Sequence, residues 1–131
     1  MPFCDPLTAA GPAVREIFDH PEKYAKKTLP VIGEILTARE MVDTFVRVTG
    51  QPARYASAYS REELLHHFPS FAADEPLVRE LIGMVEYAVE YGYYARNRDL
   101  TWSRDIDAGA LTWETFLRRA DWKGDLRTFA S

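Results

Sequence analysis

The sequence is poor in cysteine and has no long hydrophobic run. Cys4 is the only cysteine among the 131 residues, so an internal disulfide is excluded. An unpaired cysteine is typical of a reducing compartment, and we therefore expect a cytoplasmic protein. No apolar run approaches the roughly 18 residues that a membrane-spanning helix needs. Residues 1–6 also lack the basic and apolar regions of a signal peptide, so we predict no membrane partner.

Closely spaced glycines are lacking as well. The chain has seven glycines, and the shortest interval between two of them is from Gly83 to Gly92. A dinucleotide-binding turn of the G-x-G-x-x-G kind needs glycines that are close together, because the backbone must approach the pyrophosphate at a helix N-terminus. No such turn is possible here, and we therefore predict no cofactor.

The charge balance and the composition narrow the class of protein. A net charge of −4 and a pI near 5.4 argue against nucleic acid as the partner, which requires a basic face. Hydrophobic residues make up 47% of the chain and charged residues 27%, which are the values of a folded globular domain. A chain of this length can bury a core as a single domain.

Helical signals dominate the chain. Thr37 with Glu40 and Ser60 with Glu63 have the spacing of capping boxes, and Pro12 suits the first position of a helix. The expected helices are residues 11–19, 37–50, 60–69, 74–92 and 112–120. Two short runs, residues 28–32 and 53–57, have the composition of strands. The predicted fold is therefore α+β and predominantly helical, with about five helices and two short strands.

The helix expected from residue 74 onwards, which leads into an aromatic turn ending at Trp102, is unusually apolar. Two adjacent stripes follow its helical spacing: Leu77, Leu81, Met84, Ala88 and Tyr91, and Val78, Ile82, Val85 and Val89. Together they cover about half of the circumference, more than the roughly 100° that a surface helix commits to its core. We therefore expect a second surface to cover this helix, either a ligand or another chain. A symmetric homodimer would cover both this face and the edges of the short strands.

Several short segments resemble NmrA-like proteins of the atypical short-chain dehydrogenase/reductase superfamily. They are Pro2-Phe3 with Asp5, Gly33-Glu34 with Leu36-Thr37, Thr49-Gly50-Gln51-Pro52, Glu90-Tyr91-Gly92-Tyr93-Tyr94, and Leu111-Thr112-Trp113-Glu114 with Phe116-Leu117. The resemblance covers residues 1–124 and implies the substrate-binding lobe of that family, followed by a frayed tail at 125–131. It does not extend to the family's Rossmann half. A reductase pair of the Tyr-x-x-x-Lys kind is also missing, the nearest spacing being Tyr94-x-x-x-Arg98.

Aromatic side chains indicate where a ligand would bind. Tyrosines and a tryptophan gather around the end of the long helix, and such rigid rings suit an aromatic or prenylated molecule. The predicted substrate-binding residues are Phe3, Phe68, Met84, Tyr87, Tyr91 and Trp102. The alternative is that these side chains pack the core of a small lobe.

Four polar residues are candidates for acid–base chemistry. In the family, the segment that holds Asp5 leaves the central sheet beside the substrate pocket, so Asp5 is a possible acid or base. His66 can titrate near neutral pH, although a histidine at a helix end also serves as a favourable charge there. Tyr94 can donate a hydrogen bond to an oxyanion, and Arg98 can bind a carboxylate or phenolate. For each of these residues a turn, cap or solvated role is the alternative. We predict no metal site, because neighbouring histidines on a helix diverge.

Two functional hypotheses follow from these residues. In the first, the lobe is a cofactor-independent acid–base enzyme of specialised metabolism, a cyclase, isomerase or lyase that acts on a small hydrophobic molecule. In the second, it is a non-catalytic binding or regulatory module, or a truncated NmrA-like protein that pairs with a Rossmann-bearing partner.

Overall fold

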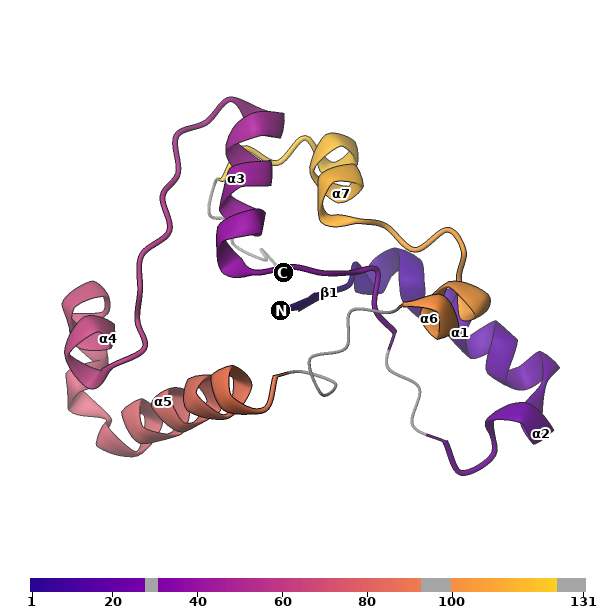
Figure 1. Ribbon diagram of the computed structural model, residues 1–131, viewed down its shortest axis with the longest axis horizontal. Coiled ribbons are helices and arrows are strands. Elements are labelled where there is room, and N and C mark those ends of the chain that lie inside the picture. The colour runs from indigo at the N-terminus through magenta and orange to yellow at the C-terminus, as the bar shows by residue number, and fades with distance from the viewer. Residues whose placement is uncertain (28–30, 93–99, 125–131) are drawn as a thin grey trace, which may run out of the picture. The chain divides into compact units, whose positions relative to one another are not determined.

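The computed structural model describes residues 1–27, 31–92 and 100–124. These described residues form seven α-helices, one 3-10 helix and one two-stranded antiparallel sheet (Figure 1). The predicted predominantly helical α+β fold is therefore confirmed. The chain divides into two compact units, which we call unit 1 (Met1–Arg54 and Arg98–Ser131) and unit 2 (Tyr55–Asn97). The prediction of a single lobe over residues 1–124 stays a prediction.

Unit 1 contains the sheet and most of the helices. Its described elements are β1 (Pro2–Phe3), α1 (Pro6–Asp19), α2 (Pro21–Tyr24), β2 (Glu34–Ile35), α3 (Ala38–Thr49), α6 (Thr101–Ile106) and α7 (Trp113–Ala120). In the sheet, Pro2 pairs with Ile35 and Phe3 pairs with Glu34. The N-terminal segment is thereby fixed against the segment that leads into α3.

Both predicted strands differ from the structure. Residues 53–57 form no strand, because within the described chain no neighbouring strand pairs with them. Of the run 28–32, only Val31 and Ile32 are described, and neither is in a strand. The backbone of Ile32 instead bonds to a side chain: its N–H donates to Ser103 Oγ at 3.3 Å, and its carbonyl accepts from the same hydroxyl at 2.7 Å. The sequence showed the β-branched composition but not this side-chain partner.

The helix ends follow the predicted caps, with one exception. Thr37 and Ser60 each complete a capping box, Thr112 caps α7, and Gly50 ends α3 at a φ of 70°. The first helix, however, begins at Pro6 rather than Gly11, because the Asp5 carboxylate accepts the Leu7 N–H and caps it. The predicted place of Pro12 at the first helical position was therefore wrong, since it lies inside α1.

The core of unit 1 lies between α3 and α7, which pack side by side. Leu36, Trp113 and Leu117 are buried at its centre. The partly buried side chains around them come from β1, α3 and the chain from α7 onwards: Phe3, Met41, Phe45, Val48, Phe116 and Trp122. This aromatic-rich packing joins the sheet to both helices.

The helix α6, which the sequence did not predict, holds the loop before β2. The Arg104 guanidinium donates to the carbonyl oxygens of Gly33 at 2.5 Å and Ala110 at 2.7 Å. At Gly33 the chains approach so closely that an added Cβ would lie 2.1 Å from the Leu111 carbonyl oxygen. Only glycine allows this approach. The two segments that lead into α3 and α7 are therefore fixed to each other.

Unit 2 is made of α4 (Arg61–His67), the 3-10 helix η1 (Pro69–Ala73) and α5 (Glu75–Glu90). The Asp74 carboxylate caps α5 by accepting the Leu77 N–H at 3.1 Å, and Gly92 follows its end at a φ of 72°. The predicted helix over residues 74–92 is therefore confirmed. Along α5, Val78 is 1% exposed, whereas Met84 is 53% exposed. The second predicted stripe thus contains the buried position, and the first is largely exposed.

Candidate functional site

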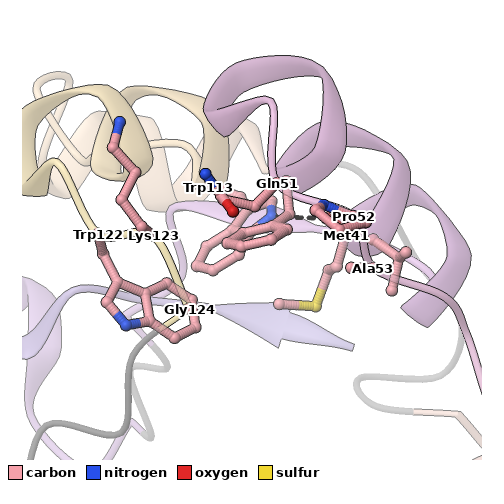
Figure 2. Close-up of a pocket in the computed structure, with 10 residues that line it drawn as sticks. Met41, Gln51, Pro52, Ala53, Trp113, Trp122, Lys123 and Gly124 are labelled. Carbon is pink, nitrogen blue, oxygen red and sulfur yellow. Dashed lines mark hydrogen bonds between the residues drawn. The ribbon is translucent and has the colours of Figure 1, made fainter.

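An open apolar groove of about 550 Å³ lies in unit 1 beside α3 and α7, and we call it the α3–α7 groove (Figure 2). Its lining comes from α3, from the segment after α3, and from the two ends of α7. The lining residues are Met41, Val42, Phe45, Gln51, Pro52, Ala53, Trp113, Trp122, Lys123 and Gly124. All of them belong to one compact unit.

Local sequence rules explain how the groove forms. Met41, Val42 and Phe45 lie on one face of α3 at helical spacing. Beyond α7, Asp121 at a φ of 48° and Gly124 at a φ of 92° turn the chain. This turn places the ring centroid of Trp122 5.5 Å from that of Phe45. A Cβ at Gly124 would lie only 3.1 Å from the Phe45 ring, so glycine is required at this turn.

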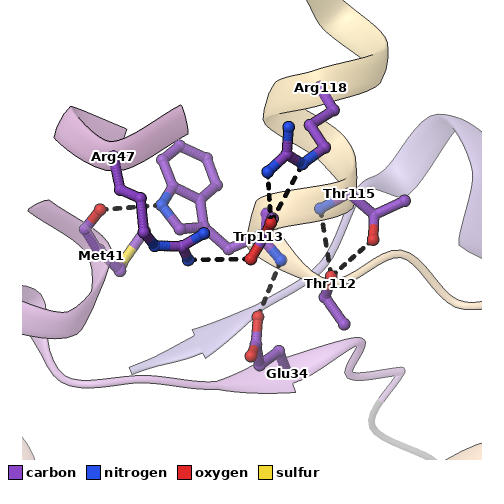
Figure 3. Close-up of polar contacts among 8 residues, drawn as sticks. Glu34, Met41, Arg47, Thr112, Trp113, Thr115 and Arg118 are labelled. Carbon is purple, nitrogen blue, oxygen red and sulfur yellow. Dashed lines mark hydrogen bonds and ion pairs between the residues drawn. The ribbon is translucent and has the colours of Figure 1, made fainter. Parts of the chain in front are cut away.

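Trp113 is the fixed wall of the groove (Figure 3). Its indole N–H donates to the Met41 carbonyl at 3.0 Å, and its backbone N–H donates to the Glu34 carboxylate at 2.8 Å. The ring centroid lies 5.3 Å from that of Phe3 and 6.2 Å from that of Trp122, with edge-to-face geometry in both cases. Because its N–H is already bonded, Trp113 offers the groove an apolar ring held in one orientation.

An exposed ion-pair network links the helices beside the groove. Glu114 accepts from Arg47 of α3 at 2.8 Å and from Arg118 of α7 at 2.8 and 3.0 Å (Figure 3). The hydrogen bond from Arg47 and then that from Arg118 lower the pKa of Glu114 to about 2. Glu114 therefore stays ionised at neutral pH and holds a charge-assisted contact between α3 and α7.

Apart from the tryptophan indoles, the described lining residues with polar side chains are Gln51, which has a carboxamide, and Lys123, which has an ammonium group. Lys123 pairs with Asp121 at 2.7 Å, and their side chains are 46% and 81% exposed. No histidine, cysteine or carboxylate occurs among the described lining residues. The groove is therefore equipped for apolar contact, with one positive charge at its lining.

The predicted residues of unit 1 have structural contacts. Phe3 packs against Trp113 and Phe116 in the core, which is the packing alternative considered for it. The Asp5 carboxylate caps α1 through the Leu7 N–H at 3.2 Å and the Thr8 hydroxyl at 2.8 Å. Trp102 lies on α6 and is half-buried.

The predicted residues of unit 2 lie on its helices and the joints between them. His66 is exposed at the end of α4, and its ring centroid lies 5.1 Å from that of His67. Phe68 stacks on Phe71 at 5.4 Å. On and just after α5, Met84, Tyr87 and Tyr91 are more than half exposed, and the two tyrosine rings lie 5.0 Å apart.

Tyr94 and Arg98 lie outside the described residues. None of the eight predicted residues that are described lines the α3–α7 groove. The groove was missed because its walls come from two sequence regions far apart. A signal was present, however: the apolar faces of the predicted helices at 37–50 and 112–120 both contain lining residues.

A second hollow of about 530 Å³ lies beside α1. Half of its described lining residues are charged, and two of these, Arg15 and Asp19, pair with each other at 3.4 Å. Over residues 1–27, 31–92 and 100–124, no group of three histidine, cysteine or carboxylate side chains could hold a metal ion. No helix within that part of the chain is long and apolar enough to cross a membrane.

Comparison with known proteins identifies the family. The model of the NmrA-like family matches residues 1–117, which is most of the chain. The chain therefore belongs to the NmrA-like family, as the resemblance indicated. Comparisons with curated proteins and with solved structures found no match.

Proposed function

We propose that this NmrA-like chain binds a small hydrophobic molecule in the α3–α7 groove. The observation that carries the proposal is the groove itself, whose walls are two tryptophans, a phenylalanine and a methionine. Binding without catalysis is the second of the two functions that the sequence suggested, and the groove favours it over the first.

The size and chemistry of the groove support binding of a metabolite-sized molecule. Its volume of about 550 Å³ lies within the range that small-molecule sites occupy, roughly 300 to 1,000 Å³. Aromatic walls give a large contact area with little loss of side-chain entropy on binding. The hydrogen bond of the Trp113 indole to Met41 fixes one wall before a ligand arrives. A preorganised wall lowers the cost of binding.

The acid–base reaction stays a prediction. Lys123 is the only titratable side chain among the described lining residues. A catalytic base must be able to reach the proton that it removes. The Asp5 carboxylate instead accepts hydrogen bonds from the Leu7 N–H and the Thr8 hydroxyl, which cap α1. Cyclase, isomerase or lyase activity would therefore have to use Lys123 or groups other than the described lining residues of the groove. Pairing with a Rossmann-bearing partner likewise stays a prediction.

Filling the groove tests the proposal without removing a core side chain. Ala53 is exposed and lines the groove, so Ala53→Trp would place an indole in the space for the ligand. The matched control is Ala56→Trp, because Ala56 is also exposed and is not among the described lining residues of the groove. The probes are 2-naphthamide and 2-naphthoate, titrated into the full chain by calorimetry.

We expect saturable binding of at least one naphthalene to the wild type and to Ala56→Trp. For Ala53→Trp we expect the affinity to fall at least about tenfold, because the added indole occupies the space for the ligand. A tenfold loss of affinity corresponds to about 1.4 kcal/mol of binding free energy. If neither probe binds the wild type, or if Ala53→Trp binds as well as its control, the groove is not the site.

The predicted homodimer concerns unit 2 rather than the groove. Leu77, Met84 and Tyr91 recur at seven-residue intervals along α5 and just beyond it, and their exposed fractions are 36%, 53% and 55%. Such a stripe is suited to pairing with the same stripe of a second copy, as in a helix–helix dimer. Light scattering should then give twice the mass of the chain, and a Met84→Glu variant should give the mass of one. A monomeric wild type would remove the dimer proposal.

A further inference from the structure

We propose that the ligand of the α3–α7 groove is a flat aromatic anion, whose ring lies against Trp113 and Trp122 and whose anionic group is bound by Lys123. This inference rests on the proposed binding function and adds the ligand's chemical class. An aromatic carboxylate or phenolate has the required chemistry.

The arrangement of the rings favours an aromatic ligand over an aliphatic one. Trp122 stands edge-to-face against both Phe45 and Trp113, at interplanar angles of 61° and 66°. Trp113 is also stacked on Phe116, at 16° and a centroid distance of 5.7 Å. The rings in and behind the walls of the groove are therefore held in several orientations. Another aromatic ring can make offset-stacked or edge-to-face contacts with such walls, and these contacts add about 0.5–1.5 kcal/mol beyond the buried area.

The charge of the lining favours an anion. Among the described lining residues, Lys123 is the only charged one, and none of them carries a carboxylate that would repel an anionic ligand. Its present partner, Asp121, is 81% exposed, and such exposed pairs are weak, so a ligand anion can compete for the ammonium group. Lysine carries its charge on a flexible stem, which allows it to turn from one carboxylate to another.

Gln51 adds a neutral polar contact. Gln51 is exposed, and its backbone N–H donates to the Thr49 hydroxyl at 3.1 Å, whereas its carboxamide makes no hydrogen bond to another described residue. A carboxamide can donate to an anionic oxygen while Lys123 supplies the charge. Aromatic walls can also bind a quaternary ammonium group, but that ligand carries the same charge as Lys123, and no carboxylate occurs among the described lining residues to stabilise it.

The test compares two probes of nearly equal shape at pH 7. 2-Naphthoate carries one negative charge, and 2-naphthamide carries none. We expect the wild type to bind the acid about fivefold more tightly than the amide, the factor that corresponds to an exposed charge contact of about 1 kcal/mol. Lys123→Met keeps the apolar stem and should remove this preference while leaving the affinity for the amide nearly unchanged.

A matched lysine controls for net charge. Lys27 is exposed and does not line the groove, so Lys27→Met should keep the fivefold preference. Equal binding of the two probes by the wild type would overturn the anion proposal and leave the groove proposal intact. So would a preference that survives in Lys123→Met. Failure of both probes would instead contradict the binding function itself.

Discussion

The two units contain aromatic side chains of similar kinds and use them differently. In unit 1, Trp113 is 9% exposed and meets Phe3, Phe116 and Trp122. In unit 2, Tyr87 is 63% exposed and pairs chiefly with its helical neighbour Tyr91. The ring of Trp113 is therefore held by contacts with other segments of unit 1, whereas the ring of Tyr87 mainly contacts a neighbour on the same helical segment.

The difference has a physical origin in the partners of each helix. The helices α3 and α7 face each other, and each brings an apolar face to the other. The apolar surface of α5 is wider than the face that α4 and η1 contact, so part of it stays exposed. A groove with fixed walls needs contacts between helices that are distant in the sequence, such as those between α3 and α7. Local pairs along one helix provide contact area but no enclosure.

The largest expected effect comes from removing the shared aromatic residue. Trp113→Ala should lower the free energy of unfolding by about 3–5 kcal/mol, because a buried ring and its packing are lost. Tyr87→Ala removes an exposed ring and should change it by no more than about 0.5 kcal/mol. Urea denaturation of the two variants measures the contrast. Equal losses would mean that the rings of the two units are equally buried.

A smaller effect should follow from adding one methyl group. Gly33→Ala places a Cβ against the Leu111 carbonyl, and such overpacking costs about 1–3 kcal/mol. Gly83→Ala in α5 meets nothing within 4 Å and should stabilise the chain by about 0.5–1 kcal/mol, since alanine favours helix. Thermal unfolding should show a lower melting temperature for Gly33→Ala and a higher one for Gly83→Ala than for the wild type. A neutral Gly33→Ala would show that the loop before β2 is not held as the structure describes.

The smallest effect concerns the Glu114 network and depends on pH. The pKa of Glu114 is about 2 in the folded chain, below its ordinary value of 4.5, because of the hydrogen bonds from Arg47 and Arg118. A lowered folded pKa gives stability that is present above pH 4.5 and lost as the pH falls towards 2. The Glu114→Gln variant should therefore be slightly less stable than the wild type at pH 7, and the gap should close across that window.

A control variant separates Glu114 from the other carboxylates. In unit 2, hydrogen bonding to Arg61 likewise lowers the pKa of Glu75, and the charges of Arg61 and Arg79 add to this effect. Glu75→Gln should likewise lose a small, acid-sensitive contribution, but should leave probe binding in the groove unchanged. A stability difference between Glu114→Gln and wild type that stays constant from pH 7 to pH 2 would contradict the assigned pKa.

Sequence reasoning predicted best what is local. The capping boxes at Thr37 and Ser60 and the helix stop at Gly50 depend on residues within one turn, and all three were confirmed. The start of α1 was missed because the prediction placed Pro12 at the first helical position, whereas Pro6 occupies that position behind the Asp5 cap. The helix α6 was missed because no side chain caps its N-terminus.

What could not be predicted depends on contacts between distant segments. The strands β1 and β2 are only two residues long and exist through each other, so neither leaves a pattern of its own. The apolar faces of α3 and α7 were each visible in the sequence, but not that they face each other. The turn that brings Trp122 to Phe45 needs Gly124 and a left-handed Asp121, a combination without a fixed sequence signature.

The most direct test is a crystal structure of the full chain with 2-naphthoate bound. The proposed function predicts the naphthalene ring between α3 and the chain after α7, against Trp113 and Trp122, and the further proposal of an anionic ligand places its carboxylate at Lys123. Density for the probe along the α5 tyrosines, with the groove left empty, would contradict it and would favour the site predicted from aromatic density in the sequence.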